Sequence, residues 1–329
     1  MSALITKDTK PAEIEALKPY AKYLMYKCVP VDKPAVEMSF EEMNREQPTW
    51  NVDSMIRGME RLTALAENGN IMYDVYTPEE CTEDPEKADV KLLYMPAEKQ
   101  PSDKPFVIAV SGGAYTCVCS IVESFPTAAR LNELGYNVFV FNYRCLRDPL
   151  FPMPADDLAA AIGYILKNKE RFGIQNDEYI VNGYSAGGSL TCIWGAEKTG
   201  WKKYGLPRPK ALFAIYPFIS FDTMENEGMK NWFRSMMFGS TSDDELAYTY
   251  DVARNFTAEY PPAYIVQAKD DPAVPVRNSI WLSELMKEHN IPHHLELIET
   301  GGHGWGDGSG TDAAGWPDRA ADWENALQD

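Results

Sequence analysis

Residues 183–187 read Gly-Tyr-Ser-Ala-Gly, and they lie between an apolar run, Tyr179-Ile180-Val181, and a helix-like run from Ser189 to Glu197. This is the G-x-S-x-G pattern in a strand–turn–helix setting, which places a serine hydroxyl at the tip of a sharp turn. The turn needs neighbours without side chains, because strand and helix must approach each other closely while the hydroxyl projects. The pattern predicts that Ser185 is a nucleophile.

A serine hydroxyl is a weak nucleophile at neutral pH and needs an adjacent base. The chain has only four histidines, which are His289, His293, His294 and His303. The first three fall at a helix end or a strand start, where histidines are common on protein surfaces. His303 follows the last expected strand in the loop Gly-Gly-His-Gly-Trp-Gly, whose glycines let the backbone bend. His303 is therefore the predicted base.

The base needs an acidic partner that holds its tautomer and stabilises the imidazolium. Asp270 and Asp271 both follow the seventh expected strand, and the order serine, aspartate, histidine is the one expected for a G-x-S-x-G turn of this type. The spacing alone does not choose between the two aspartates.

Backbone N–H groups are needed where negative charge develops on a substrate carbonyl. The residue after the nucleophile, Ala186, supplies one such donor. The loop Ser-Gly-Gly-Ala-Tyr at 111–115 follows a fully apolar strand, and its small residues allow a carbonyl to approach the backbone. We expect Gly113, Ala114 and Ala186 to form an oxyanion hole. We also expect Tyr115, Tyr184 and Trp305 to bind substrate.

Strand and helix signals alternate from residue 71 onward, which indicates an α/β fold with one doubly wound, mostly parallel sheet. The first two strands are expected to form an antiparallel pair. Eight strands are expected at 71–76, 90–95, 106–110, 137–142, 178–182, 210–216, 263–268 and 293–299. The intervening helices are expected at 124–134, 155–169, 186–198, 275–289 and 313–327.

Two regions fall outside this alternation. Residues 1–70 carry only helical pattern, with Met55, Met59, Leu62 and Leu65 on one face of the stretch 53–67. Residues 221–257 form an insertion rich in aromatic residues and methionine around 232–238. Such clusters either belong to the core or fold over the strand ends as a small helical cap. We therefore expect a catalytic domain over 71–329, an N-terminal helical segment over 1–70 that is a candidate cap, and a lid-like insertion near 221–257.

The formal net charge of −18 argues against nucleic acid and anionic membrane surfaces as partners, since both would repel the protein. The N-terminus is too charged for a signal peptide, so a cytoplasmic location is expected. The six cysteines show no paired C-x-x-C spacing, and neither a metal site nor a cofactor is expected. A reactive thiol at Cys117 or Cys119 stays open, because both lie close to the 111–115 loop.

Six ordered motifs together resemble the α/β-hydrolases of the hormone-sensitive-lipase-like group, including bacterial acetyl-xylan and feruloyl esterases. The similarity covers residues 71–329. The motifs are Ser-Gly-Gly-Ala-Tyr (111–115), Asn-Tyr-Arg (142–144), Pro-Ala-Asp-Asp-Leu (154–158), Gly-Tyr-Ser-Ala-Gly-Gly (183–188), Asp-Asp-Pro-Ala-Val-Pro (270–275) and Gly-Gly-His-Gly (301–304).

The resemblance implies that the acid belongs to an Asp-x-x-Val-Pro pattern, which matches Asp271. The histidine that leads the family's oxyanion loop is replaced here by Ser111, which leaves the support of that loop in question. Arg144 and Asp157 match positions that imply an ion pair beneath the site. The N-terminal 70 residues match no segment of the family.

The resemblance implies a serine carboxylesterase acting on a small-molecule ester, with short acyl or hydroxycinnamoyl groups on plant-derived sugars as the expected substrates. An amidase or peptidase of arylformamidase type would use the same machinery and is the alternative. A non-catalytic binding protein on this fold is a third interpretation, since a fold alone does not specify a function. The sequence does not indicate the oligomeric state.

Overall fold

The computed structural model describes residues 4–239 and 244–327. Its centre is one eight-stranded sheet with the strand order β1-β2-β4-β3-β5-β6-β7-β8. The strands are β1 (Met72–Asp74), β2 (Lys91–Met95), β3 (Phe106–Val110), β4 (Val138–Asn142), β5 (Tyr179–Tyr184), β6 (Ala211–Ile215), β7 (Ala263–Ala268) and β8 (His293–Ile298).

The sheet is antiparallel at one edge and parallel elsewhere. β1 pairs antiparallel with β2, which confirms the expected hairpin, and β2 also pairs antiparallel with β4. All other pairings, from β4 through β8, are parallel. The central strands β3, β5 and β6 are buried along their whole length, as expected where helices cover both faces of a parallel sheet.

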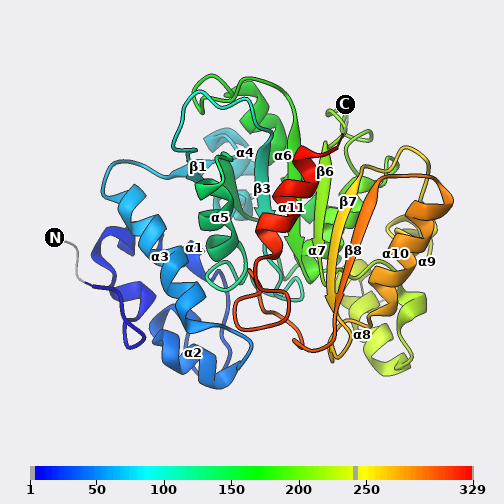
Figure 1. Ribbon diagram of the computed structural model, residues 1–329, viewed down its shortest axis with the longest axis horizontal. Helices are drawn as coiled ribbons and strands as arrows, with labels where there is room; N and C mark the ends of the chain where they lie inside the picture. Colours follow the sequence, from blue (N-terminus) through cyan, green and yellow to red (C-terminus); the bar gives the residue numbers. More distant parts are fainter. Residues whose placement is uncertain (1–3, 240–243, 328–329) are drawn as a thin grey trace.

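Helices flank the sheet on both sides (Figure 1). α5 and α11 pack together on one side, α6 and α7 pack together on the other, and α10 lies against β7 and β8. These helices are α5 (Ser124–Glu133), α6 (Met153–Lys167), α7 (Ala186–Gly195), α10 (Arg277–Glu288) and α11 (Trp316–Asn325). The expected helix after the serine ends three residues early, at Gly195, where the chain turns.

The N-terminal segment packs on the outside of α5. Gly58 of α3 (Val52–Ala66) lies so close to α5 that a Cβ there would be 2.9 Å from the backbone nitrogen of Pro126. Before α3 come α1 (Ala21–Leu24) and α2 (Phe40–Glu46), whose capping box at Ser39 and Glu42 fixes the helix start. Short 3₁₀ helices span Pro11–Glu13, Glu15–Tyr20 and Ala35–Glu37.

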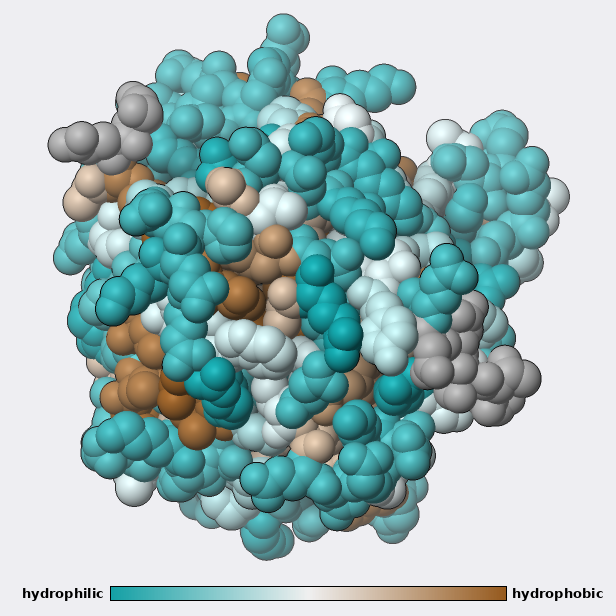
Figure 2. Space-filling view, turned by 90° about the vertical axis from the view of Figure 1, so that its right-hand side faces the viewer, coloured by the Kyte–Doolittle hydropathy of each residue, from teal (hydrophilic) through white to brown (hydrophobic). Residues whose placement is uncertain are grey.

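The remaining helices lie in two connections. α4 (Pro78–Glu83) and a 3₁₀ helix (Pro85–Asp89) join β1 to β2. A 3₁₀ helix (Phe221–Thr223), α8 (Glu227–Phe238) and α9 (Asp244–Thr249) form the insertion between β6 and β7. In the part of the chain that the structure describes, no helix has both the length and the apolar character needed to cross a membrane. Hydrophilic side chains predominate on the face shown in Figure 2.

Candidate active site

Ser185 sits on the turn between β5 and α7, with φ 51° and ψ −118°. Positive φ is costly for a residue with a side chain, and such strain persists only where neighbours enforce it. The neighbours here are glycines in close contact with other segments. A Cβ on Gly187 would lie 2.0 Å from the carbonyl oxygen of Val110, and one on Gly183 would lie 2.1 Å from Thr191 Oγ1. The motif therefore has its glycines where backbone and side chains leave no room for a methyl group.

The three side chains expected at the site meet at the carboxyl ends of β5, β7 and β8. His303 Nε2 lies 2.8 Å from Ser185 Oγ, and His303 Nδ1 lies 2.8 Å from Asp271 Oδ2. The backbone N–H groups of Ala273 and Val274 donate to the other oxygen, Asp271 Oδ1, at 2.8 and 2.9 Å. The carboxylate is thereby fixed in orientation while its Oδ2 faces the imidazole.

Asp270 has a different set of partners. Its Oδ1 accepts hydrogen bonds from the backbone N–H groups of Gly301 and Gly302, at 3.0 and 2.8 Å. The neighbouring aspartates thus divide the contacts: Asp271 faces the imidazole of His303, and Asp270 binds the backbone of the loop that carries it.

The 111–115 loop lies directly against the serine. A Cβ on Gly112 would be 2.7 Å from Ser185 Cβ, so only a glycine permits this approach. Gly113, Ala114 and Tyr115 all have positive φ, of 126°, 51° and 59°. Ala186 is the first residue of α7, and the first N–H groups of a helix have no acceptor within it.

Glu123 is a buried carboxylate that the motifs did not reveal. Its Oε2 accepts a hydrogen bond from Gly112 N–H at 2.5 Å, and its Oε1 accepts one from the Tyr216 hydroxyl at 3.0 Å. The same hydroxyl accepts a hydrogen bond from Gly306 N–H, and the Tyr216 ring lies 4.7 Å from the His303 ring. Glu123 thus joins the 111–115 loop to the histidine loop. Burial raises the pKa of Glu123 to about 7. An acidic residue directly before the apolar helix at 124 was the only sequence signal for it.

Arg144 and Asp157 form the expected ion pair. Arg144 Nη2 lies 2.6 Å from Asp157 Oδ1, and both side chains are buried. Arg144 Nη1 also contacts Asp84 at 2.6 Å, and the Tyr76 hydroxyl donates to Asp157 Oδ1. Neither residue of the pair lines the pocket beside Ser185, so the pair is structural.

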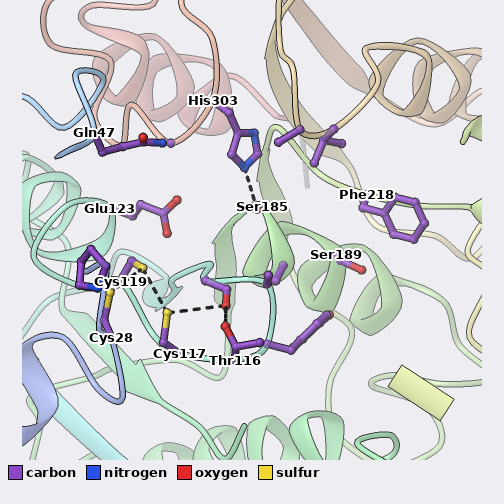
Figure 3. A pocket seen from close by; sticks show the side chains of 18 of the residues that line it. Cys28, Gln47, Thr116, Cys117, Cys119, Glu123, Ser185, Ser189, Phe218 and His303 are labelled. Atoms are coloured by element: carbon purple, nitrogen blue, oxygen red, sulfur yellow. Dashed lines mark hydrogen bonds between the residues drawn. The ribbon is translucent and has the colours of Figure 1, made fainter. Parts of the chain in front are cut away.

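A pocket of about 600 Å³ opens over Ser185 and His303 (Figure 3). Its walls come from the N-terminal segment, the 111–119 loop and the 221–257 insertion. The lining residues include Cys28, Glu46, Gln47, Trp50, Tyr115, Cys117, Cys119, Glu123, Leu146, Ser189, Phe218, Met224, Phe233, Met237 and Val274. Thr49 donates a hydrogen bond to the His303 carbonyl at 2.8 Å, so the N-terminal segment also contacts the histidine loop.

The three residues expected to bind substrate lie in different places. Tyr115 lines the pocket, although it is largely buried. Tyr184 and Trp305 are not among the lining residues. Tyr184 is completely buried and its hydroxyl donates to Asn182, while Trp305 is buried against the ring of Tyr216. Tyr184 and Trp305 therefore lie outside the pocket, because side chains that flank a strand end also point into the core.

The cysteines are less scattered than their spacing indicates. The Sγ atoms of Cys28, Cys117 and Cys119 all lie within 4.8 Å of one another, at the wall of the same pocket. Residue 28 is far from the other two in sequence, and only the docking of the N-terminal segment brings them together.

Comparison with known proteins places these features in a family. Residues 92–286 match the BD-FAE family. Among curated proteins, the chain is 27% identical over 207 residues to endo-1,4-beta-xylanase B of Butyrivibrio fibrisolvens, an alignment covering 60% of this chain and 32% of that protein. It is 26% identical over 207 residues to acetylxylan esterase of Xylanibacter ruminicola, covering 62% and 41%. The chain thus spans less than half the length of these curated relatives.

Solved structures share the fold. An acetyl ester-xyloside bifunctional hydrolase from Caldicellulosiruptor lactoaceticus superposes with a TM-score of 0.67 at 25% identity, covering 78% of this chain and 95% of that chain. The carboxylesterase Cest-2923 from Lactobacillus plantarum superposes with a TM-score of 0.61 at 23% identity, covering 72% and 91%.

Proposed function

Because this chain belongs to the BD-FAE family within the α/β-hydrolases, we propose that it is a serine carboxylesterase. The observation that carries the proposal is the chain of hydrogen bonds from Asp271 through His303 to Ser185, with 2.8 Å at each link. This arrangement can deprotonate a serine hydroxyl and return the proton to a leaving group. Its position at the base of an open pocket gives an ester carbonyl access to the serine.

The geometry supports the following reaction. Ser185 Oγ attacks the ester carbonyl while His303 Nε2 takes the hydroxyl proton, and Asp271 stabilises the imidazolium that forms. The N–H groups of Gly113, Ala114 and Ala186 stabilise the negative charge on the carbonyl oxygen. His303 then protonates the leaving alcohol. Water, deprotonated by the same imidazole, attacks the acyl-enzyme and releases the acid.

The substrates we propose are short acyl or hydroxycinnamoyl esters of plant-derived sugars. Apolar side chains from the 221–257 insertion, including Met224, Phe233 and Met237, line one side of the pocket and suit an acyl group. Polar side chains of Glu46 and Gln47 line the pocket from the N-terminal segment and suit an alcohol rich in hydroxyl groups. The acetylxylan esterase among the relatives agrees with a sugar ester. In this interpretation the N-terminal segment and the insertion together act as a cap.

The test is hydrolysis of p-nitrophenyl acetate, butyrate and octanoate, methyl ferulate and acetylated xylo-oligosaccharide by the wild type and by Ser185→Ala. We expect turnover by the wild type and a loss of roughly 10⁶-fold in kcat in the variant, the size seen in another serine hydrolase. Ser102→Ala is the control, because Ser102 is a buried serine that lies before β3, at the opposite end of that strand from the 111–115 loop. Turnover of an aryl formamide but of no ester by the folded protein would contradict the proposal.

A further inference from the structure

Three thiols from two distant segments converge at one side of the pocket (Figure 3). Cys117 Sγ lies 3.7 Å from Cys119 Sγ, and Cys28 Sγ lies 4.0 Å from Cys119 Sγ. Figure 3 shows the three sulfur atoms grouped apart from Ser185 and His303. The proposed ester hydrolysis uses none of them.

The backbone that carries these thiols is held in place. Tyr26 and Val118 form an antiparallel bridge between the two segments, with Val118 N–H donating to the Tyr26 carbonyl at 2.9 Å. Cys119 N–H donates to the Gly112 carbonyl at 3.0 Å, and Cys117 N–H donates to the Gly113 carbonyl at 3.2 Å. The sulfur atoms are therefore preorganised by backbone contacts.

The sulfur spacing suits a thiophilic metal ion. With Zn–S bonds of about 2.3 Å and tetrahedral angles, three bound sulfurs lie about 3.8 Å apart. The two measured separations of 3.7 and 4.0 Å bracket this value. The third pair of sulfurs lies within 4.8 Å, so a small side-chain movement would complete the set.

We propose that Cys28, Cys117 and Cys119 bind one Zn²⁺ ion, whose fourth coordination position faces the pocket. Binding forms three Zn–S bonds, and each thiol that is still protonated releases its proton to solvent. No electron is transferred. Since Cys28 belongs to the N-terminal segment and the other two to the loop after β3, the ion joins that segment to the loop. It therefore stabilises the wall of the pocket opposite the insertion.

The experiment uses the full chain, reduced and freed of metal by a chelator that is then removed. Zn²⁺ is titrated against a chromophoric competitor, and Cd²⁺ is titrated while the ultraviolet sulfur-to-metal charge-transfer band is recorded. We expect about one ion per chain, a Cd²⁺ band typical of three thiolates, and a melting temperature that rises with the Zn²⁺ concentration.

The variants are Cys28→Ser, Cys117→Ser and Cys119→Ser, each nearly isosteric, and each is expected to lose the stoichiometric site and the Cd²⁺ band. Cys81→Ser is the control, because Cys81 is a partly exposed cysteine of α4 outside the cluster, and it should bind as the wild type does.

Three results would overturn the proposal. The first is the absence of a Cd²⁺ charge-transfer band in the wild type. This result would overturn the proposal even if the variants failed to fold. The second is Zn²⁺ binding that persists in all three variants. Such binding would mean that other residues, for example His303 and Asp271, hold the ion. Spontaneous oxidation of two of the thiols to a disulfide in preference to metal binding would likewise count against it. None of these results depends on esterase activity, so the two proposals fail independently.

Discussion

The carboxylate of Glu123 accepts a hydrogen bond from the backbone N–H of Gly112 at 2.5 Å, directly behind the loop that faces Ser185. Through its other oxygen, Glu123 also binds the Tyr216 hydroxyl, which in turn contacts the histidine loop at Gly306. One buried side chain thus sets the distance between the loop with the proposed oxyanion donors and the loop with the proposed base. Glu123 thus supports the 111–115 loop, in which Ser111 stands where the family has a histidine.

Glu123→Gln should lower kcat by about 10- to 100-fold with little change in KM. An amide has one oxygen, so it cannot accept hydrogen bonds from both Gly112 and Tyr216, and the 111–115 loop shifts. The expected fall in kcat is smaller than the loss of about 10²–10³-fold that follows when an oxyanion donor is removed outright. Steady-state kinetics on p-nitrophenyl acetate measures this. Glu324→Gln is the matched control, since Glu324 is also buried and accepts a hydrogen bond from a tyrosine, Tyr136, far from the pocket. An unchanged kcat in Glu123→Gln would show that the loop is positioned without this carboxylate.

Glu123 also makes the free energy of unfolding depend on pH. Burial raises the pKa of Glu123 from 4.5 to about 7 in the folded state, so the folded chain holds a proton that the unfolded chain releases. The free energy of unfolding therefore falls as pH rises from about 4.5 to 7, by up to about 3 kcal/mol at about 1.4 kcal/mol per pKa unit. Urea unfolding at several pH values should show this fall in the wild type relative to Glu123→Gln. A difference between the two that does not change with pH would contradict the assignment.

The two neighbouring aspartates should respond differently to the same substitution. Asp271→Asn should reduce kcat by about 10⁴-fold, as in another enzyme of this kind, because an amide facing His303 Nδ1 favours the wrong tautomer. Asp270→Asn keeps an oxygen for the N–H groups of Gly301 and Gly302, so its activity should fall by less than about tenfold, while stability drops by about 1 kcal/mol. Kinetics and thermal melts of both variants check the ranking. A larger kinetic loss in Asp270→Asn would reverse the proposed roles.

Much of the fold and of the candidate site could be predicted because both depend on local signals. Apolar runs predict buried strands, and β3 and β7 have the expected bounds, each beginning directly after a proline, Pro105 or Pro262. Glycines predict the sharp turns around Ser185 and His303. Gly302 and Gly304 have positive φ, which few other residues adopt, and Gly183 and Gly187 lie where a Cβ would clash.

What the sequence did not reveal depends on packing between distant segments. Glu123 has no motif, and its role follows from contacts with residues 11 and 93 positions away. Cys28 meets Cys119 across 91 positions, because the N-terminal segment docks beside the loop after β3. Tyr184 and Trp305 lie within two residues of Ser185 and His303, yet both are buried in the core, since neighbours on a strand or a tight loop point in opposite directions. Such contacts follow from the tertiary structure and not from spacing.

Gly112→Ala should strongly reduce the proposed esterase activity by geometry alone. Gly112 does not have a positive φ, so alanine is conformationally allowed there, but the added Cβ would lie 2.7 Å from Ser185 Cβ and 2.8 Å from the Tyr184 carbonyl. The loop must move away from the serine, which carries the proposed donors Gly113 and Ala114 out of reach. We expect kcat to fall by about 10²–10³, as when an oxyanion donor is lost, and stability to fall by about 1–3 kcal/mol from overpacking.

The matched control for Gly112→Ala is Gly163→Ala, at a site where nothing lies within 4 Å of the new methyl group. Gly163 lies inside α6, where alanine favours the helix by up to about 1 kcal/mol, so this variant should be as active as the wild type and slightly more stable. We would measure the kinetics and melting temperatures of the two variants side by side. The comparison separates the effect of the close contact between the new Cβ and Ser185 from the general effect of replacing a glycine. If Gly112→Ala kept its kcat, the 111–115 loop could not be the source of the oxyanion donors, and Ala186 alone would have to fill that role.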